Sequence, residues 1–346
     1  MPHWFNNSSS SFPLYLAPMA GITDVVFRQM CKQLGADVMV TEFVSAEGIL
    51  QADERTRKYT EFDDGQRPVG VQLFGADGNR MGEAARKIID WKQPDFIDIN
   101  FGCPVNKVVS KNGGSSLLKD CPLLTSVAEG IVKAVPIPVT AKIRIGWDES
   151  SINAVTVCKL LEDTGIAAIA IHGRTRAQGY TGLANWEVIA ECAAAVKIPV
   201  VGNGDIASGQ DVEKRRNETG VSGVMIGRAA MHNPWVFREA KHYLATGTHL
   251  APVTDEERFE FLLQHCRLAL KSSRYQGTEL QTLRSMRTRL MAYTSGLPGG
   301  KHLRVRFCKV ESLAELEDIV ADYLANRWTG NDHDTLTESA PALALS

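Results

Sequence analysis

The stretch DFIDINFGCP, residues 95–104, begins as a short apolar strand and ends in residues that cannot continue one. Gly102 frees the backbone, while Pro104 removes a hydrogen-bond donor and fixes φ. The thiol of Cys103 and the amide of Asn100 are therefore presented where a strand gives way to a loop. In a barrel of parallel strands, chemistry takes place at that end. A lone cysteine is more often a buried core residue than a functional thiol, so the rest of the chain has to decide between these two interpretations of Cys103.

Eight short apolar runs, this one included, alternate with seven segments of helical pattern. The alternation predicts βαβ units and a parallel sheet, and eight strands are the number of a closed (β/α)8 TIM barrel. An open doubly wound sheet is the alternative, but the GxGxxG that normally follows its first strand is absent. The expected strands are 14–19, 38–43, 69–75, 96–100, 138–146, 168–175, 199–206 and 223–229, and the expected helices are 25–34, part of 48–67, 82–91, 126–135, 152–163, 186–196 and 212–219.

Beyond Ala245 the strand-like runs stop, and three helical patterns follow over 255–273, 280–294 and 312–327. Gly, Pro and Thr cluster at 247–254, as expected of a boundary. We therefore expect a small all-helical domain after the barrel. The predicted organisation is an N-terminal extension (1–13), a barrel (14–246), a helical domain (247–328) and a disordered tail (329–346).

Composition excludes several classes of protein. The chain has 346 residues, 44% hydrophobic and 23% charged, with a net charge of −2, so no global basic signal points to nucleic acid. Seven scattered cysteines without a CxxC pair suggest neither a zinc site nor a disulfide framework, and a reducing cytoplasm fits best. No secretory signal and no membrane-spanning run is visible.

Polar residues interrupt five of the predicted strands near the same end. A buried Lys or His is costly unless it is paired or bound to a ligand, and one such residue alone could equally be a satisfied core group. Five together predict one shared polar pocket. They are Gln72, Asn100 with Cys103, Lys142, His172, and Asn203 with Asp205.

The last two predicted strands end in Asn203-Gly204-Asp205 and Gly227-Arg228. Loops after strands seven and eight form the usual phosphate site of such barrels, although two ordinary turns would look the same. A cation at Lys142 could stabilise negative charge on a phosphate-anchored heterocycle such as reduced flavin, and His172 could bond the same edge or a phosphate. Flavin mononucleotide (FMN) fits this pattern, and other phosphorylated ligands fit it nearly as well.

Six ordered motifs make the chain resemble the tRNA-dihydrouridine synthases, most of all the B-type bacterial branch. The resemblance extends from about Leu14 to Arg327, and the Gly-Cys-Pro segment is its most specific part. The motifs are LAPMAGITD (16–24), DINFGCPVNKV (98–108), AKIRIGW (141–147), IHGRTR (171–176), GNGDI (202–206) and MIGRA (225–229).

The resemblance implies an FMN-binding barrel and a helical tRNA-binding domain that together reduce tRNA uridines to 5,6-dihydrouridine with NADPH. It implies that Cys103 is the catalytic acid and that Asn100 and Arg174 line the uracil site. The cofactor residues that it implies are Ala17, Pro18, Met19, Gln72, Lys142 and His172 at the ring system, and Asn203, Gly204, Asp205, Gly227 and Arg228 at the phosphate.

The implied chemistry agrees with these residue types. Hydride from flavin N5 can add at uracil C6 and leave enolate character at C5, which a positioned acid must protonate. Cys103 has a proton to give, and this role needs a thiol, whereas a nucleophilic cysteine needs a thiolate. The protein's part is to place flavin and base in register.

A local basic stretch supports an RNA partner. Between Leu280 and Val310 there is no Asp or Glu, and such a stretch can follow phosphates, although a solvated helix face with a loop is equally expected without the resemblance. Lys107 and Lys111 could extend this surface to the mouth of the site. The seven cations are Arg284, Arg287, Arg289, Lys301, Arg304, Arg306 and Lys309. No membrane and no obligate protein partner is expected.

Two other functions fit parts of the pattern. An FMN barrel acting on a small-molecule enone or pyrimidine would share the barrel and the phosphate turns but would not need the basic helical appendix. A non-catalytic RNA-binding protein could keep the flavin as structure, but Cys103 and Lys142 argue against it. Reduction of bound flavin by NADPH would separate an enzyme from such a protein.

Overall fold

The computed structural model describes residues 12–105, 113–272, 274–275 and 277–326. The chain divides into two compact units between Ala251 and Pro252. The expected N-terminal extension and C-terminal tail fall almost entirely outside the described residues, as do Lys107 and Lys111.

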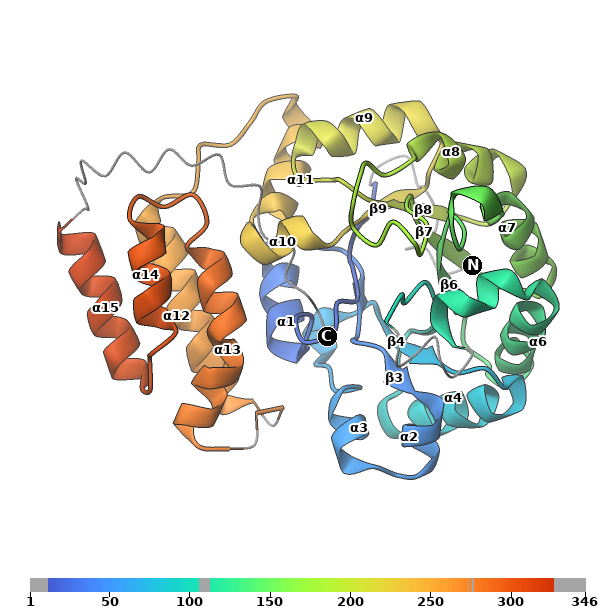
Figure 1. Cartoon of the computed structure of the whole chain (residues 1–346), viewed down its shortest axis with the longest axis horizontal. Coiled ribbons are helices and arrows are strands. Elements are labelled where there is room, and N and C mark those ends of the chain that lie inside the picture. The colour runs from blue at the N-terminus through green and yellow to red at the C-terminus, as the bar shows by residue number, and fades with distance from the viewer. Residues whose placement is uncertain (1–11, 106–112, 273, 276, 327–346) are drawn as a thin grey trace. The chain divides into compact units, whose positions relative to one another are not determined.

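The first unit is a barrel of parallel strands, as predicted (Figure 1). The strands pair in the order β1-β9-β8-β7-β6-β5-β4-β2. A parallel bridge between Tyr15 and Val38 joins β1 to the start of β2 and closes the ring. The strands are β1 (Leu14–Leu16), β2 (Met39–Val40), β3 (Val44–Ser45), β4 (Val69–Phe74), β5 (Phe96–Phe101), β6 (Val139–Arg144), β7 (Ala168–His172), β8 (Val200–Asn203) and β9 (Gly223–Ile226).

The second predicted strand is the one that differs. Residues 38–43 were expected to form a single run, but the backbone forms β2, leaves regular pairing at 41–43, and resumes as β3, which pairs only with β4. The side chain of Glu42 is turned to accept a hydrogen bond from the Gly21 N–H at 2.6 Å. The Thr41 N–H still bonds the Gly70 carbonyl at 2.9 Å, but the Gln72 N–H bonds the Thr41 hydroxyl at 3.2 Å. A side-chain oxygen therefore takes the place of a backbone acceptor where the ladder is interrupted.

Two glycines of the barrel strands make room for aromatic side chains. A Cβ on Gly70 in β4 would lie 2.1 Å from the Phe96 ring, and one on Gly202 in β8 would lie 2.3 Å from the Trp186 ring. Both rings are buried. Any larger residue at either glycine would displace an aromatic core side chain, because protein interiors are close-packed.

Helices surround the strands of the barrel (Figure 1). Side-chain caps start several of them: Asp24 accepts from the Phe27 N–H at 2.9 Å, and Ser208 forms a capping box with Asp211. The helices are α1 (Val25–Gln33), α2 (Ala46–Leu50), α3 (Glu54–Lys58), α4 (Gly78–Lys92), α6 (Cys121–Val132), α7 (Ala154–Asp163), α8 (Trp186–Ala195), α9 (Gly209–Thr219), α10 (Arg228–His232) and α11 (Val236–Thr246). The sequence reading missed α10 and α11.

The second unit is helical, as predicted, and consists in the described residues of α12 (Asp255–Lys271), α13 (Glu279–Tyr293), α14 (Gly300–Phe307) and α15 (Leu313–Asn326). The sequence reading missed α14, a short helix that begins at a glycine and has no side-chain cap. Among the described residues of both units, none of the helices combines the length and the hydropathy needed to cross a membrane.

Candidate active site

The polar strand residues meet inside the barrel because parallel register aligns them. Asn100 lies opposite Lys142 across β5 and β6. His172 lies opposite Arg144 on one side and opposite Asn203 on the other. Paired residues of neighbouring strands point to the same face, so these side chains share the barrel interior at its carboxyl end. The strand register thus brings the polar residues of β5, β6, β7 and β8 together, as expected from the sequence.

A chain of hydrogen bonds leads from the barrel interior to the Cys103 loop. The Gln72 amide donates through Nε2 to Asp98 Oδ2 at 2.6 Å and accepts at Oε1 from Asn100 Nδ2 at 2.8 Å. Asn100 Oδ1 in turn accepts the N–H groups of Cys103 at 2.8 Å and Gly102 at 3.1 Å. Gln72 and Asn100 therefore hold the backbone on which the thiol is mounted.

Cys103 is buried, with 7% of its surface exposed. Burial raises the pKa of its thiol, and the Val105 N–H and the cations of Arg144 and Lys142 offset only part of that rise. The carbonyl of Cys103 accepts both the backbone N–H and the hydroxyl of Ser115, at 3.1 and 2.8 Å. The group is a fixed, protonated thiol, which suits a proton donor better than a nucleophile.

Lys142 presents a cation with donor capacity to spare. Within the described residues its Nζ makes one hydrogen bond, to Asn203 Oδ1 at 3.2 Å. Asn203 is fixed in turn, since its Nδ2 donates to the Met225 carbonyl at 2.7 Å. Burial, followed by repulsion from Arg144, lowers the pKa of Lys142 to about 8, while Asp98 acts in the opposite direction. An ammonium in this position can donate to an anionic or carbonyl group of a bound molecule.

His172 is neutral at ordinary pH. Burial and the nearby cations of Lys142, Arg144, Arg174 and Arg228 hold its pKa well below the usual range. Its Nε2 lies 3.4 Å from Arg174 Nη1, which can only donate, so Nε2 is the acceptor and Nδ1 carries the proton.

Arg174 bonds the protein through its Nε and Nη2 groups. Its Nη2 bonds both carboxylate oxygens of Asp205, at 2.8 and 2.9 Å, and the Gly182 carbonyl at 2.6 Å. Its Nε bonds the Thr181 carbonyl at 3.2 Å. With a 2% exposed surface, Arg174 holds the loop after β7 in place, and little of its guanidinium is left for the uracil contact that the resemblance implies.

Asp205 is an acceptor for protein groups. Besides Arg174, it accepts the Ala184 N–H at 2.7 Å and lies 3.4 Å from Arg228 Nη2. Burial raises the pKa of Asp205, but the Ala184 N–H, Arg174 and Arg228 together outweigh burial and hold that pKa below the usual range. The residue has a positive φ of 52°. A carboxylate here would orient Arg228 toward a phosphate without contacting the phosphate itself.

The remaining predicted cofactor residues lie where β1, β8 and β9 end. The Ala17 N–H extends the β1–β9 ladder by bonding the Ile226 carbonyl at 2.9 Å, and a Cβ on Gly227 would lie 3.5 Å from the Cβ of Ala17 and 3.7 Å from the Met19 sulfur. Pro18 and Met19 are half-buried. Gly204 has a φ of +134°, which only glycine adopts readily.

Arg144 and Tyr180 are site residues that the sequence reading missed. Arg144 bonds the Gly102 carbonyl at 3.0 Å and the carbonyls of Thr175 and Gly179 at 2.7 and 2.9 Å, so it ties the Cys103 loop to the loop after β7. Its position two residues after Lys142, on the same face of β6, was a usable signal. Tyr180 lies in an irregular loop and carried no signal.

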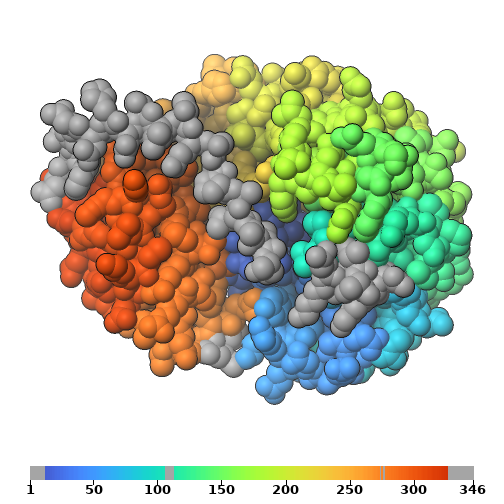
Figure 2. Space-filling view, in the orientation of Figure 1, coloured from blue at the N-terminus to red at the C-terminus, as the bar shows by residue number. Residues whose placement is uncertain are grey.

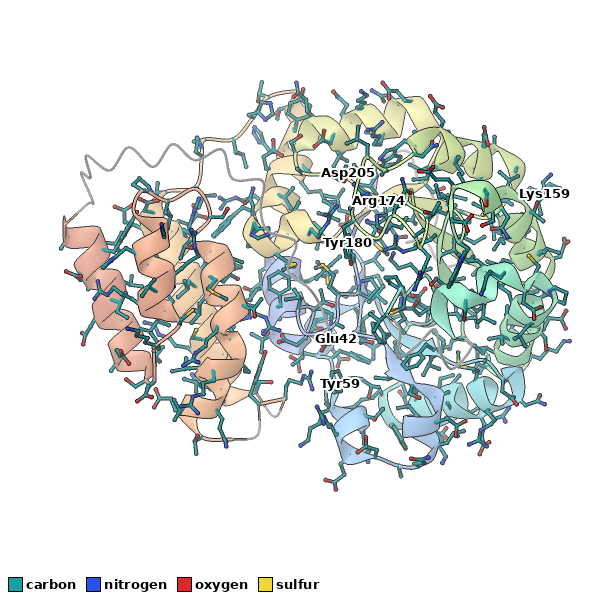
Figure 3. All side chains as sticks on the ribbon, in the orientation of Figure 1. Glu42, Tyr59, Lys159, Arg174, Tyr180 and Asp205 are labelled. Atoms are coloured by element: carbon teal, nitrogen blue, oxygen red, sulfur yellow. The ribbon has the colours of Figure 1, made fainter. Side chains whose placement is uncertain are left out.

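Tyr180 is exposed at the surface above these groups, 47% accessible. The Arg228 guanidinium lies 4.6 Å from its ring centre, and the His172 ring lies 6.2 Å away. Figure 3 shows Tyr180, Arg174 and Asp205 gathered over one part of the barrel unit, and in Figure 2 the yellow-green loop that carries Tyr180 forms part of the outer surface. An exposed aromatic ring beside a cation can pack against a planar ligand.

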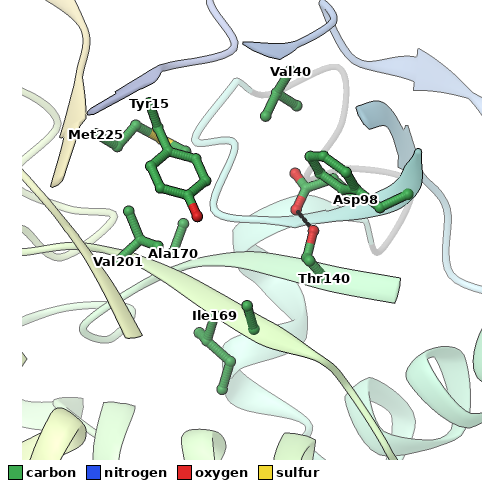
Figure 4. A pocket seen from close by; sticks show the side chains of 10 residues that line it. Tyr15, Val40, Asp98, Thr140, Ile169, Ala170, Val201 and Met225 are labelled. Atoms are coloured by element: carbon green, nitrogen blue, oxygen red, sulfur yellow. Dashed lines mark hydrogen bonds between the residues drawn. The ribbon is translucent and has the colours of Figure 1, made fainter. Parts of the chain in front are cut away.

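Deeper in the barrel, the described residues enclose a small cavity. A cavity of about 20 Å³ lies among side chains of several strands, with Tyr15 and Asp98 at opposite sides (Figure 4). Its size suits about one water molecule, so it is not a ligand site. The lining residues are Tyr15, Val40, Phe96, Asp98, Thr140, Ala168, Ile169, Ala170, Val201 and Met225.

The basic stretch of the second unit is only partly available to a partner. Arg289 is buried, and Arg306 pairs with Asp322. Lys301 and Lys309 are exposed on and just after α14. The sequence reading counted these cations as one surface, but helix packing divides them.

Comparison with known proteins gives one consistent result. The family model described as dihydrouridine synthase matches residues 15–327. A protein of Pseudomonas aeruginosa named tRNA-dihydrouridine synthase B is 41% identical over 91% of this chain and 93% of its own length. One of the same name from Pseudomonas syringae is 40% identical over 94% of this chain and 96% of its length, and a probable tRNA-dihydrouridine synthase of Rickettsia bellii is 38% identical over 86% and 90%.

Proposed function

The chain belongs to the dihydrouridine synthase family, and we propose that it is an FMN-dependent oxidoreductase that reduces specific uridines of tRNA to 5,6-dihydrouridine with NADPH. The observation that carries the proposal is the constellation inside one barrel mouth: a buried protonated thiol, a lysine with spare donors and a neutral histidine. A cytoplasmic location is part of the same proposal.

The residues present fit FMN. Lys142 has donor capacity that no described residue uses, as a flavin carbonyl edge requires. Gln72, whose orientation is fixed by Asp98, and His172, with its proton on Nδ1, are further polar groups that would hold the ring system. Arg228 is half-exposed and held by Asp205, as expected of a phosphate ligand at the loop after the last strand. Bound FMN, once reduced by NADPH, would supply the hydride.

Cys103 would supply the proton. Its thiol is buried and its pKa is raised, so it carries a proton at neutral pH. Arg144 fixes the Gly102 carbonyl, and Asn100 fixes the N–H groups of Gly102 and Cys103, directly before the carbon that carries the thiol. A positioned acid of this kind typically contributes about 10²- to 10⁴-fold to a rate.

Access to this site requires an unstacked base. The thiol and Lys142 lie within the barrel, so a uridine stacked in tRNA must be turned out to reach them, at a cost of a few kcal/mol. Tyr180, exposed at the mouth beside Arg228, offers an aromatic surface for such a base or its neighbour. The exposed lysines 301 and 309 of the second unit are candidate phosphate contacts.

An absorbance spectrum of the purified protein, before and after anaerobic NADPH, tests the cofactor. We expect flavin bands that bleach with NADPH. A colourless protein that takes up no added FMN would overturn the cofactor assignment and, with it, the roles of Lys142 and His172.

A small-molecule enone or pyrimidine reductase remains the second candidate, because the barrel site alone would serve it. Tests with free uridine and with tRNA distinguish the two. Turnover of free uridine at a rate equal to that of tRNA would favour the small-molecule enzyme.

A further inference from the structure

Asp98 is a buried carboxylate that the proposed chemistry leaves without a role. It lies in β5, 4% exposed, two residues before Asn100 and opposite Thr140 of β6. Its Oδ1 accepts from the Thr140 hydroxyl at 2.5 Å, and its Oδ2 accepts from the Gln72 amide at 2.6 Å. Figure 4 shows the bond to Thr140 at the side of the small cavity. A buried carboxylate is costly, so its position calls for an explanation.

The bonds from Asp98 to Cys103 have a fixed direction. At one end, Oδ2 of Asp98 can only accept, so Gln72 must donate to it through Nε2. The Oε1 of Gln72 is then left to accept from Asn100. Asn100 must then donate through Nδ2, and its Oδ1 is left to face Gly102 and Cys103. At the other end stand two backbone N–H groups, which can only donate. Reversing any one amide would place donor against donor or acceptor against acceptor.

We propose that Asp98 and Thr140 are positioning residues that set the direction of the Gln72–Asn100 amide relay and thereby fix the backbone that carries the Cys103 thiol. The inference deepens the proposed function, on which its catalytic meaning rests. Thr140 matters because a hydroxyl can either donate or accept. It can therefore complete the relay for a carboxylate, a carboxylic acid or an amide at position 98.

This adaptability gives an unusual expectation for substitutions. In Asp98→Asn, the new amide donates to the Thr140 hydroxyl and still accepts from Gln72, so the relay keeps its direction. In Thr140→Val, the carboxylate of Asp98 still accepts from Gln72. Only the double variant leaves the new amide without a hydroxyl partner. Its buried NH₂ then has no acceptor, and the side-chain shift that relieves this cost takes the oxygen at position 98 away from Gln72 Nε2. Gln72 and Asn100 then lose their fixed end, and the acceptor that holds the N–H groups of Gly102 and Cys103 is loosened.

The test is a double-mutant cycle on the flavin-loaded full chain, with single-turnover reduction of tRNA and KM as the first readouts. We expect each single variant to stay within about threefold of the parent rate, and the double variant to lose more than roughly tenfold in rate with KM for tRNA little changed. If Asp98→Asn alone matched the double variant, the charge and not the direction would be the function of Asp98, and the proposal would fall. Equal rates in all four proteins would also overturn it.

A second readout does not depend on activity toward tRNA. The rate at which iodoacetamide alkylates Cys103, followed by mass spectrometry of its peptide, reports the exposure and reactivity of the thiol directly. We expect parental rates in both single variants and a change of at least about threefold in the double variant. An unchanged rate in a folded double variant would refute the relay. If the double variant did not fold, a large change in either single variant would still refute it. Failure of the proposed function would appear instead as absent tRNA reduction in the parent with a normal alkylation pattern.

Discussion

Lys142 is a cation in a setting that opposes its charge. Its pKa is lowered to about 8, so below pH 8 the folded protein carries a charge that burial disfavours. Between pH 8 and the ordinary lysine pKa, the unfolded chain binds more protons than the folded protein, and the free energy of unfolding therefore rises with pH. We therefore expect Lys142→Met to raise the free energy of unfolding of the flavin-free protein at pH 7 by on the order of 2 kcal/mol. The gain should shrink as pH rises toward about 10.4, the ordinary lysine value.

Urea denaturation at pH 7 and pH 9.5 measures this, and turnover should fall in the same variant. A Lys142→Met protein that was less stable than the parent at pH 7 would show that the cation is well solvated or paired in the folded state. The prediction separates a residue kept for chemistry from one kept for stability.

Cys103 can be tested by removal of its sulfur. Cys103→Ala should keep bound flavin, since no part of the proposed cofactor site depends on the thiol, and should lose turnover by about 10²-fold or more. Cys308→Ala is the matched control, because that cysteine is exposed and lies in the second unit. Stopped-flow reduction of tRNA by the prereduced protein is the measurement, and a normal rate in Cys103→Ala would remove the thiol from the reaction.

Two buried arginines hold the loop between β7 and α8, because their guanidinium groups donate hydrogen bonds to the backbone carbonyls of that loop. Arg144 bonds Thr175 and Gly179, and Arg174 bonds Thr181 and Gly182. Asp205→Ala would leave Arg174 buried without its carboxylate. We expect a loss of about 1–3 kcal/mol in the free energy of unfolding and faster proteolysis within residues 175–184.

The matched control for that variant is Glu218→Ala, because the Glu218 carboxylate is exposed and pairs with Arg215 at 3.8 Å, so its loss should matter little. Because the pKa of Asp205 is lowered, its contribution is present above the ordinary aspartate pKa and is lost as pH falls through the folded-state value. Equal stability of Asp205→Ala and the parent at pH 7 would mean that the loop carbonyls alone satisfy Arg174.

Regular elements were predictable from sequence because their patterns are local. Apolar runs gave the strands, and polar residues at their ends gave Gln72, Asn100, Lys142 and His172 as one group. The break between β2 and β3 was not predictable, because it involves the Thr41 hydroxyl as the acceptor for the N–H of Gln72, a residue distant in sequence. Tyr180 was missed for a similar reason, since its place follows from arginines on β6 and after β7. The direction of the Asp98 relay depends on three strands at once and has no sequence signature.

For the whole molecule, the proposed tRNA contact of the second unit can be separated from the chemistry of the first. Lys301→Glu with Lys309→Glu should weaken tRNA binding and reduce the slope of log affinity against log salt by about 2, one for each lost phosphate contact. The flavin spectrum should not change. Arg306→Glu is a poor choice for this test, because Arg306 pairs with Asp322 and its reversal would also disturb α14 and α15.

Binding should be measured by fluorescence anisotropy with labelled tRNA over a range of salt concentrations. Arg284→Glu, on an exposed position of α13 near Glu311, serves as a comparison within the same unit. Unchanged affinity and slope in the double lysine variant would place the tRNA contact elsewhere on the molecule.

The central claim is that this barrel reduces uridine in tRNA. The most direct test incubates the purified flavin-loaded protein and NADPH with tRNA from a strain that lacks dihydrouridine, and then analyses the nucleosides by mass spectrometry. The account predicts dihydrouridine in the tRNA with the parent protein and almost none with Cys103→Ala. Unreduced tRNA with a parent protein whose flavin is reduced by NADPH would contradict it and would point to a different substrate for the same site.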